Sequence, residues 1–314
     1  MRIGVVALAL LLSGCGTDRQ ANPAARAASE PPRIALVMKS LANEFFVTMA
    51  DGAKAHQAAN SGSFTLIVNG IRNESDLTQQ VALVEQMMAQ GVQAIVIAPA
   101  DSRALVPVLA KAQRQGIVVV NIDNKLDEET LKQAGIDIPF VGPDNRAGAK
   151  DVGEAVATHL QRGDEVAILE GIPTAFNAQQ RRLGFEDAMR EAGMRVVAVQ
   201  SAHWEQDRAN AVAAAILREH PGLKAILASN DNMALGAAAA VRQAGTTGQV
   251  HVAGFDNIAA MRQLLQEGRV LATADQHADQ LAVFGIEYAL QILRGESQPQ
   301  DRQTPVDLVT TPSR

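Results

Sequence analysis

Short apolar segments alternate with amphipathic segments along most of the chain. Nine short stretches are apolar at successive positions and rich in β-branched residues: 34–38, 64–68, 94–98, 117–122, 165–169, 196–200, 225–228, 251–255 and 270–273. Such continuous runs are typical of parallel strands that helices cover on both faces. The segments between them place apolar residues at helical spacing, as Leu77, Val81 and Val84 do. The alternation predicts an α/β fold, and nine strands divide better into two parallel sheets than into one.

Glycines mark where several predicted helices end. The next predicted strand begins directly after Gly91, Gly116, Gly193 and Gly222. Glycine adopts the left-handed conformation that ends a helix, so we expect all four to be C-terminal caps.

The first 15 residues are typical of a targeting segment. Met1-Arg2 gives a positive start, residues 3–12 are almost entirely apolar, and small residues precede Cys15, the chain's one cysteine. We expect 1–14 to be a secretory signal peptide. Residues 12–15 also resemble a bacterial lipobox, which implies cleavage before Cys15 and acylation of its thiol. The alternative is an ordinary signal peptide in which Cys15 is incidental.

Residues 15–32 are rich in Ala, Pro, Ser and charge, which predicts a flexible tether after the lipidated Cys15. Acyl chains contribute about 0.8 kcal/mol per buried CH₂, so two or three would anchor the protein durably to a membrane. After residue 14 no apolar run approaches the roughly 18 residues of a spanning helix. We therefore expect a protein of the periplasm or cell envelope that is anchored and does not span the membrane.

Composition and motifs exclude several classes of protein. The 314 residues carry 28 Lys and Arg against 34 Asp and Glu, for a net charge of −6, which argues against nucleic acid as a partner. Motifs for dinucleotides, nucleotide phosphates, zinc proteases and serine hydrolases do not occur. The six histidines include no i,i+4 pair, and there is no second cysteine. We therefore expect no cofactor, no metal and no enzymatic activity.

Polar side chains follow the predicted strands at the point where each strand ends. Lys39, Asp123, Asn230, Asp256 and Gln276 all lie in such positions. In doubly wound sheets, ligands bind beyond the carboxyl ends of the strands. Carboxylates and amides together with aromatic rings suit a ligand with many hydroxyl groups, such as a sugar.

Eight motifs in a fixed order add to this interpretation: 34–37 (IALV), Asn43-x-Phe-Phe, Pro99-Ala-Asp101, Asp144-Asn145, Arg181-x-x-Gly-Phe, Asn230-Asp-x-Met-Ala-Leu-Gly, Gly254-Phe-Asp and Ala272-Thr-x-x-Gln276. Through them, residues 33–308 resemble the periplasmic ribose-type sugar-binding proteins, whose fold is shared with the core of the lactose-repressor family. The resemblance implies the type I periplasmic binding protein fold, with two Rossmann-like lobes joined by a three-segment hinge. It implies crossings near 142–144, 276–277 and 304–308, and lobes of 33–142 with 277–304 and of 143–276 with 305–314.

The resemblance also assigns a ligand site. Aromatic residues that stack on a sugar would be Phe45, Phe46 and Trp204, with Phe255 behind them. The hydrogen-bonding residues would be Asn43, Asp123, Arg181, Asn230, Asp256 and Gln276. Two positions depart from the ribose pattern, since Lys39 replaces a small hydroxyl residue and Asn124 replaces an arginine. An amide cannot replace a bidentate guanidinium, so we expect a different pattern of hydroxyl groups to be bound.

The residues themselves leave other interpretations open. Lys39 could pair with Asp123 or Asp256, could bind an acidic sugar, or could face solvent. One of the two phenylalanines could belong to the core. Arg181 could lie on a solvated helix face, and Asn230 and Asp256 could cap the helices that follow them.

Together these inferences predict a monomeric, lipid-anchored substrate-binding subunit of an ABC-type importer for a pentose, hexose or related polyol. The sugar would shift the protein toward a closed form. The permease and the ATPase would be separate chains. The alternative is a sensor subunit that presents the sugar to a chemoreceptor or a histidine-kinase ectodomain. A transcription regulator lacks support because a signal segment occupies the N-terminus, and an enzyme would need Asp123 and Asp256 as paired carboxylates.

Overall fold

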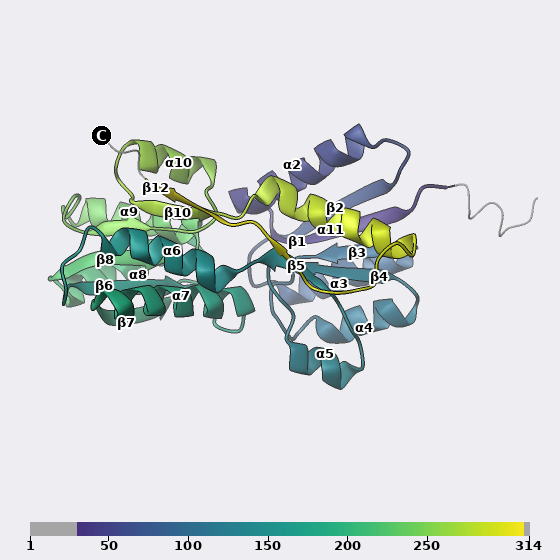
Figure 1. Cartoon of the computed structure of the whole chain (residues 1–314), viewed down its shortest axis with the longest axis horizontal. Coiled ribbons are helices and arrows are strands. Elements are labelled where there is room, and N and C mark those ends of the chain that lie inside the picture. Colours follow the sequence, from purple (N-terminus) through teal and green to yellow (C-terminus); the bar gives the residue numbers. More distant parts are fainter. Residues whose placement is uncertain (1–29, 311–314) are drawn as a thin grey trace, which may run out of the picture. The chain divides into compact units, whose positions relative to one another are not determined.

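The computed structural model describes residues 30–310. The predicted signal peptide (1–14), Cys15 and almost all of the predicted tether lie outside the described residues. From Pro32 onward the chain packs as one compact unit. It contains two six-stranded sheets of mostly parallel strands with helices on both faces, which confirms the predicted two-lobed α/β fold (Figure 1).

The first lobe is built on a sheet with the strand order β11-β5-β4-β3-β1-β2. Its strands are β1 (Arg33–Ser40), β2 (Thr65–Ile71), β3 (Ala94–Ile97), β4 (Val118–Ile122), β5 (Phe140–Pro143) and β11 (Arg302–Thr304). Its helices are α2 (Glu44–Ala59), α3 (Leu77–Ala89), α4 (Val106–Arg114), α5 (Glu128–Ala134) and α11 (Ala278–Leu293). Helices α2 and α11 pack together on one face, and side chains of α3 and α4 pack against the other.

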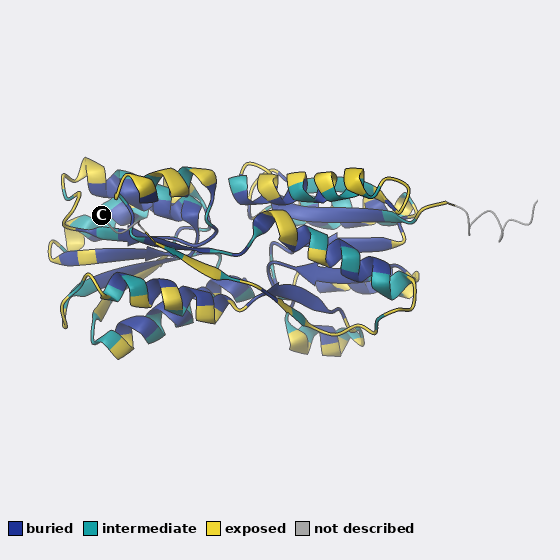
Figure 2. Ribbon diagram, turned by 45° about the horizontal axis from the view of Figure 1, so that its top comes forward, coloured by how far each residue is buried: buried dark blue, intermediate teal, exposed yellow. Residues whose placement is uncertain are grey.

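The second lobe repeats this plan with the strand order β12-β10-β9-β8-β6-β7. Its strands are β6 (Glu165–Glu170), β7 (Arg195–Ser201), β8 (Leu223–Ala228), β9 (His251–Ala253), β10 (Ala272–Asp275) and β12 (Asp307–Thr310). Its helices are α6 (Asn145–Ala157), α7 (Phe176–Ala192), α8 (Gln206–Glu219), α9 (Asp231–Gln243) and α10 (Ala259–Gln266). Helices α6 and α7 pack together on one face of this sheet, and helices α8 and α9 pack together on the other. Helices therefore cover both faces of each sheet (Figure 2).

The chain passes between the two sheets three times. It crosses between β5 and α6, between β10 and α11, and between β11 and β12. Strand β12 pairs with β10 in the antiparallel direction, whereas the other paired strands run parallel. The apolar pattern did not predict β5, β11 or β12, because these strands are only three or four residues long and β11 has no apolar residue.

Three of the four predicted glycine caps are confirmed, since Gly91, Gly116 and Gly193 have φ between 70° and 81°. The prediction for Gly222 is wrong. Helix α8 ends at Glu219 and is capped by His220, and Gly222 is not among the residues with positive φ.

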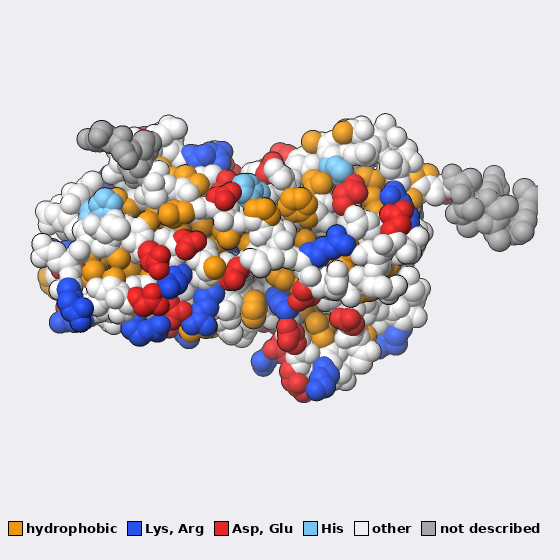
Figure 3. All heavy atoms as spheres, viewed as in Figure 1, with side chains coloured by type: hydrophobic (Ala, Val, Ile, Leu, Met, Phe, Trp, Pro, Cys, Tyr) orange, Lys and Arg blue, Asp and Glu red, His pale blue; other side chains and the backbone are white. Residues whose placement is uncertain are grey.

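Surface charge is mixed. Figure 3 shows acidic and basic side chains interspersed on the face drawn, without a continuous basic area. Among the described residues, no helix is both long enough and apolar enough to cross a bilayer.

Candidate functional site

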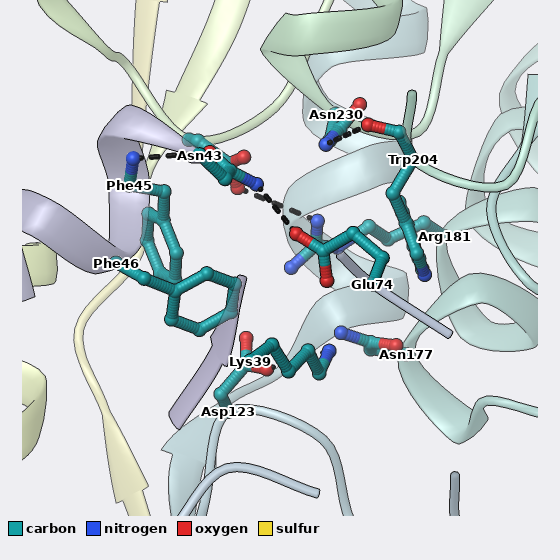
Figure 4. A pocket seen from close by; sticks show the side chains of 11 residues that line it. Lys39, Asn43, Phe45, Phe46, Glu74, Asp123, Asn177, Arg181, Trp204 and Asn230 are labelled. Carbon is teal, nitrogen blue, oxygen red and sulfur yellow. Dashed lines mark hydrogen bonds and ion pairs between the residues drawn. The ribbon is translucent and has the colours of Figure 1, made fainter. Parts of the chain in front are cut away.

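A small pocket lies where the carboxyl ends of strands from both lobes meet (Figure 4). It is open on one side, and its empty space, counted together with the solvent at this opening, is about 240 Å³. Eleven residues line it: Lys39, Asn43, Phe45, Phe46, Glu74 and Asp123 from the first lobe, and Asn177, Arg181, Trp204, Asn230 and Asp256 from the second. A compact polar ligand is what this volume and lining suit.

Lys39 and Asp123 form an ion pair on the first-lobe side of the pocket. Lys39 is at the end of β1 and Asp123 directly follows β4, and Lys39 Nζ lies 2.8 Å from Asp123 Oδ2. Both side chains are at most 4% exposed. The alternative that Lys39 faces solvent is therefore wrong. Of the two carboxylates considered for it, the structure pairs Lys39 with Asp123.

Asn43 and Glu74 form a second polar pair in the first lobe. Asn43 Oδ1 caps α2 by accepting a hydrogen bond from Phe45 N (3.1 Å), and Asn43 Nδ2 donates to Glu74 Oε1 (3.1 Å). Burial raises the pKa of Glu74 to about 7, although the nearby Lys39 ammonium and the bond from Asn43 act in the opposite direction. The carboxyl group therefore titrates near neutral pH, and its protonated form can donate a hydrogen bond.

Aromatic rings stand on opposite sides of the pocket. Phe45 and Phe46 are buried in an edge-to-face pair, with centroids 5.1 Å apart and planes at 81°. Trp204 comes from the second lobe, and Lys39 Nζ lies 5.7 Å from the ring centroids of both Phe46 and Trp204. A flat ligand with apolar C–H faces could pack against these rings.

Gly171, directly after β6, makes room for the Trp204 ring. A Cβ atom at this glycine would lie 2.1 Å from ring atoms of Trp204, closer than any normal contact. Trp204 also has a positive φ of 69°. The position of this ring therefore depends on a backbone conformation that is rare for tryptophan and on a glycine, which leaves the space that the ring fills.

Arg181 organises the second-lobe side of the pocket. It projects from α7, its Nε donates to Asn145 Oδ1 (2.8 Å), and its Nη1 donates to Ser229 O (2.9 Å). Its Nη1 also lies 3.5 Å from Asp256 Oδ1, and its guanidinium lies 3.8 Å from the Phe255 ring centroid. With an exposure of 2%, Arg181 is not on a solvated helix face.

Burial dominates the electrostatics of this group. It lowers the pKa of the Arg181 guanidinium and raises the pKa of Asp256 well above its usual value, although the charge of Arg181 opposes the second shift. Gln276 Nε2 donates to Asp256 Oδ1 at 2.7 Å. The Asp256 carboxyl group is therefore held by two side chains from different elements.

Some polar atoms at the pocket have no hydrogen-bond partner within the described residues. These buried atoms include Asn177 Oδ1, Arg181 Nη2 and Trp204 Nε1. Buried polar groups in proteins are nearly always hydrogen-bonded. The three atoms thus provide one acceptor and two donors that suit the hydroxyl groups of a ligand.

Two residues were considered as possible helix caps. Asn230 does cap α9, since its Oδ1 accepts from Met233 N at 2.9 Å, and its Nδ2 makes only a long bond to Trp204 O (3.5 Å). Asp256 is not a cap, because the N-cap of α10 is Ile258.

Most of the predicted site residues meet at this pocket. Those that line it are Lys39, Asn43, Phe45, Phe46, Asp123, Arg181, Trp204, Asn230 and Asp256. Three do not line it, for different reasons. Phe255 packs behind Arg181, Gln276 reaches Asp256 from behind, and Asn124 is buried in contacts with backbone groups of both lobes.

Sequence reasoning missed Glu74 and Asn177. Glu74 lies in a polar segment after β2 of the kind that is usually exposed. Only its position shortly after the end of a strand could have identified it as a site residue. Asn177 is the second residue of α7, one turn before Arg181, so helical spacing from Arg181 could have indicated it.

The comparisons with known proteins agree with this geometry. Residues 34–297 match the periplasmic binding protein domain family. The chain belongs to the periplasmic binding protein family. It is 56% identical over 308 residues to the D-ribose/D-allose-binding protein of Pseudomonas aeruginosa, with 97% of each chain covered. It is 34% identical to the D-allose-binding periplasmic protein of Escherichia coli, covering 88% of this chain and 89% of the relative.

Solved structures of periplasmic binding proteins have the same fold. A solute-binding protein from Burkholderia multivorans, whose unknown ligand is represented as alpha-D-erythrofuranose, superimposes with a TM-score of 0.87 at 56% identity, covering 89% of this chain and 99% of that one. A binding protein from Actinobacillus succinogenes with bound D-allose has a TM-score of 0.85 at 36% identity, covering 89% and 98%. These relatives are binding proteins and not enzymes, so the prediction that the chain catalyses no reaction is confirmed. As a member of this family, the chain is a periplasmic protein.

Proposed function

We propose that this protein binds a neutral monosaccharide of the allose or ribose class and delivers it to an ABC-type importer. One observation carries the proposal: Phe45 and Phe46 face Trp204 across a pocket of about 240 Å³ whose remaining lining is polar or charged. Rings on two sides suit the C–H faces of a sugar, and the side chains around them suit its hydroxyl groups. The likeness to proteins that bind D-ribose or D-allose supports the same class of ligand.

The charges of the pocket favour a neutral sugar over a sugar acid. Lys39 pairs with Asp123, and Arg181 lies near Asp256, so both cations in the lining have a carboxylate partner. Glu74 adds a third carboxyl group. An anionic ligand would meet more carboxyl groups than cations and would have to displace an existing ion pair.

A thermal-shift panel on the purified full-length protein tests the proposed function. The panel contains D-allose, D-ribose, D-glucose, ribitol, myo-inositol and D-gluconate. A ligand at 100 times its Kd adds about 2.7 kcal/mol to the unfolding free energy, so D-allose or D-ribose should raise the melting temperature clearly and D-gluconate should not. A shift with D-gluconate alone, or with no member of the panel, would contradict the proposal.

The delivery step needs a separate test in the cell. We propose that a permease and an ATPase on other chains receive the sugar from the closed form of this protein. A deletion strain should lose uptake of the radiolabelled sugar at micromolar concentration, and the wild-type gene should restore it. Normal uptake in the deletion strain would favour a sensory role over import.

We further propose that acyl chains on Cys15 hold the protein at a membrane, with 15–32 as the tether. The sequence 12–15 and the position of the chain's one cysteine support this. In the native host, labelled palmitate should be incorporated into the wild-type protein and not into Cys15→Ser, which should leave the membrane fraction. Equal labelling of both would exclude Cys15 as the acylated residue.

A further inference from the structure

Three helices of the second lobe, α7, α8 and α10, have no side-chain cap of their own, and two of them, α7 and α10, begin at contacts with the first lobe. The N-cap residue of α7 is Ala175 and that of α10 is Ile258, and neither side chain can accept a hydrogen bond. By contrast, α9 in the same lobe is capped by Asn230. The first backbone N–H groups of a helix have no partner within the helix, so a buried helix start needs acceptors from elsewhere.

For α7, these acceptors come from the first lobe. Phe176 N donates to Ser102 Oγ (3.0 Å), and Asn177 N donates to Asn124 Oδ1 (3.2 Å). The Asn124 amide is fixed in turn, since its Nδ2 donates to Pro99 O (3.0 Å). Ser102, Asn124 and Asn177 are all buried. The first turn of α7 is thus capped across the cleft by two side chains of the opposite lobe.

For α10, the acceptor is a carboxylate of the first lobe. Ala259 N, at the first residue of α10, donates to Glu44 Oε1 (2.8 Å), and Glu44 is itself the first residue of α2. A negative charge at a helix N-terminus is favourable, and a hydrogen bond to an ionised acceptor is stronger than a neutral one. Glu44 is half-buried and Ala259 is exposed, so this contact lies at the rim of the cleft.

We propose that Glu44, Ser102 and Asn124 act as interlobe caps, positioning residues that set ligand affinity by stabilising the closed cleft without touching the sugar. The inference rests on the proposed function, because it takes closure on a sugar as the event that is stabilised. Each cap joins one lobe to the backbone of the other, so it exists only while the lobes are together. In an open cleft, water must replace these acceptors at both helix starts.

The caps therefore act on the closing equilibrium. A contact that is present only in the closed form raises the closed fraction, and apparent affinity rises in proportion to the fraction of the binding-competent form. The same contacts must break before the sugar leaves, so their loss should appear mainly in the dissociation rate. Substitution of a lining residue would change which sugar is bound as well as how tightly.

The test measures D-allose and D-ribose binding by calorimetry and dissociation by stopped flow, for Glu44→Ala, Ser102→Ala and the double variant. Losing one capping acceptor should weaken binding about threefold for Ser102→Ala and about five- to tenfold for Glu44→Ala. The double variant should lose about the product of the two factors, because the contacts lie on separate helices. Glu44→Gln, which keeps an acceptor, should recover part of the affinity.

Matched controls separate this role from a general loss of structure. Asp51→Ala removes an exposed carboxylate from the same helix as Glu44, and Asp127→Ala removes a cap of α5 inside the first lobe. Both should bind sugar within twofold of the wild type. Interlobe caps are excluded if Glu44→Ala and Ser102→Ala also stay within twofold, or if the controls lose as much affinity as they do.

A measurement without sugar separates failure of this inference from failure of the proposed function. Spin labels at Thr48→Cys on α2 and Gln263→Cys on α10, in a Cys15→Ser background, report the distance between the lobes. In the ligand-free protein, the double variant should lose part of the short-distance population that the wild type has. If neither sugar binds, the interlobe distance distribution alone tests the interlobe caps. Identical distributions in the wild type and the double variant overturn the proposal.

Discussion

Lys39 Nζ and Asp123 Oδ2 lie 2.8 Å apart inside the cleft, on side chains that are at most 4% exposed. Removing one member of a buried pair leaves the other charge uncompensated, which typically costs about 3–5 kcal/mol. Because opening of the cleft lets water reach Asp123, we expect this cost to fall mainly on the closed form.

Lys39→Met should therefore weaken sugar binding by more than tenfold and lower the melting temperature of the sugar-bound protein more than that of the free protein. Lys54→Met is the matched control, since the Lys54 side chain is 59% exposed and should leave affinity unchanged. Titration calorimetry measures the affinity of each variant, and differential scanning calorimetry measures its melting temperature with and without sugar. Equal effects of the two substitutions would mean that the buried pair makes no special contribution.

Arg181→Lys tests the charged group of the second lobe. Lysine keeps the charge and cannot donate at the same time to Asn145 Oδ1 and Ser229 O in the fixed geometry of a guanidinium. We expect at least a hundredfold loss of affinity in titration calorimetry. Arg182→Lys, at the next residue with a side chain that is 38% exposed, should bind normally. Retained affinity in Arg181→Lys would remove Arg181 from the proposed ligand contacts.

Gly171→Ala should displace the Trp204 ring, because the added methyl group would lie 2.1 Å from its atoms. The expected result is a loss of affinity of about tenfold or more, with a changed emission spectrum from the chain's one tryptophan. Gly222→Ala is the control: its nearest neighbour is 3.4 Å away, so binding and fluorescence should stay as in the wild type. An unaltered spectrum in Gly171→Ala would contradict the close packing of this ring.

Stability of the free protein should fall as the pH rises from about 4.5 to about 7. Glu74 titrates at its usual 4.5 in the unfolded chain and at about 7 in the folded protein. Between these values the folded form holds a proton that the unfolded chain has released, so deprotonation on the alkaline side favours unfolding. Burial raises the pKa of Asp231 and Asp256 in the same direction.

Glu74→Gln should flatten this pH dependence, because the amide does not titrate. Urea unfolding at a series of pH values measures the slope for both proteins. Glu85→Gln, on the exposed surface of α3, should keep the wild-type slope. A wild-type slope in Glu74→Gln would show that Glu74 does not titrate in this range.

The strand pattern predicted nine of the twelve strands in residues 30–310, because most of these parallel strands are apolar at several successive positions. The three missed strands are short, and tertiary pairing defines them more than their side chains do: β11 (Arg302–Thr304) has a polar residue at every position. Gly222 was misassigned because the helix before it ends earlier, at Glu219. Local sequence does not indicate which residue near a glycine ends the helix.

The candidate site was predicted well where a residue ends a strand and poorly where a contact depends on the other lobe. Lys39 and Asp123 follow strands, and the structure brings them to the pocket. Asn124 also follows a strand, yet its side chain turns toward α7 of the opposite lobe. Glu74 comes from a polar loop, yet its side chain is buried. Contacts between the lobes depend on how the two folded surfaces fit together, and local sequence patterns do not predict that fit.

The order of the strands has a consequence for synthesis and export. Strand β11 completes the first sheet and β12 completes the second, and both come from residues 302–310 near the end of the chain. Helix α11, which covers the first sheet together with α2, is also made late. Neither lobe has all of its strands until residues 302–310 have left the ribosome. Residues 33–301 therefore cannot complete either sheet alone, which favours translocation in an unfolded form.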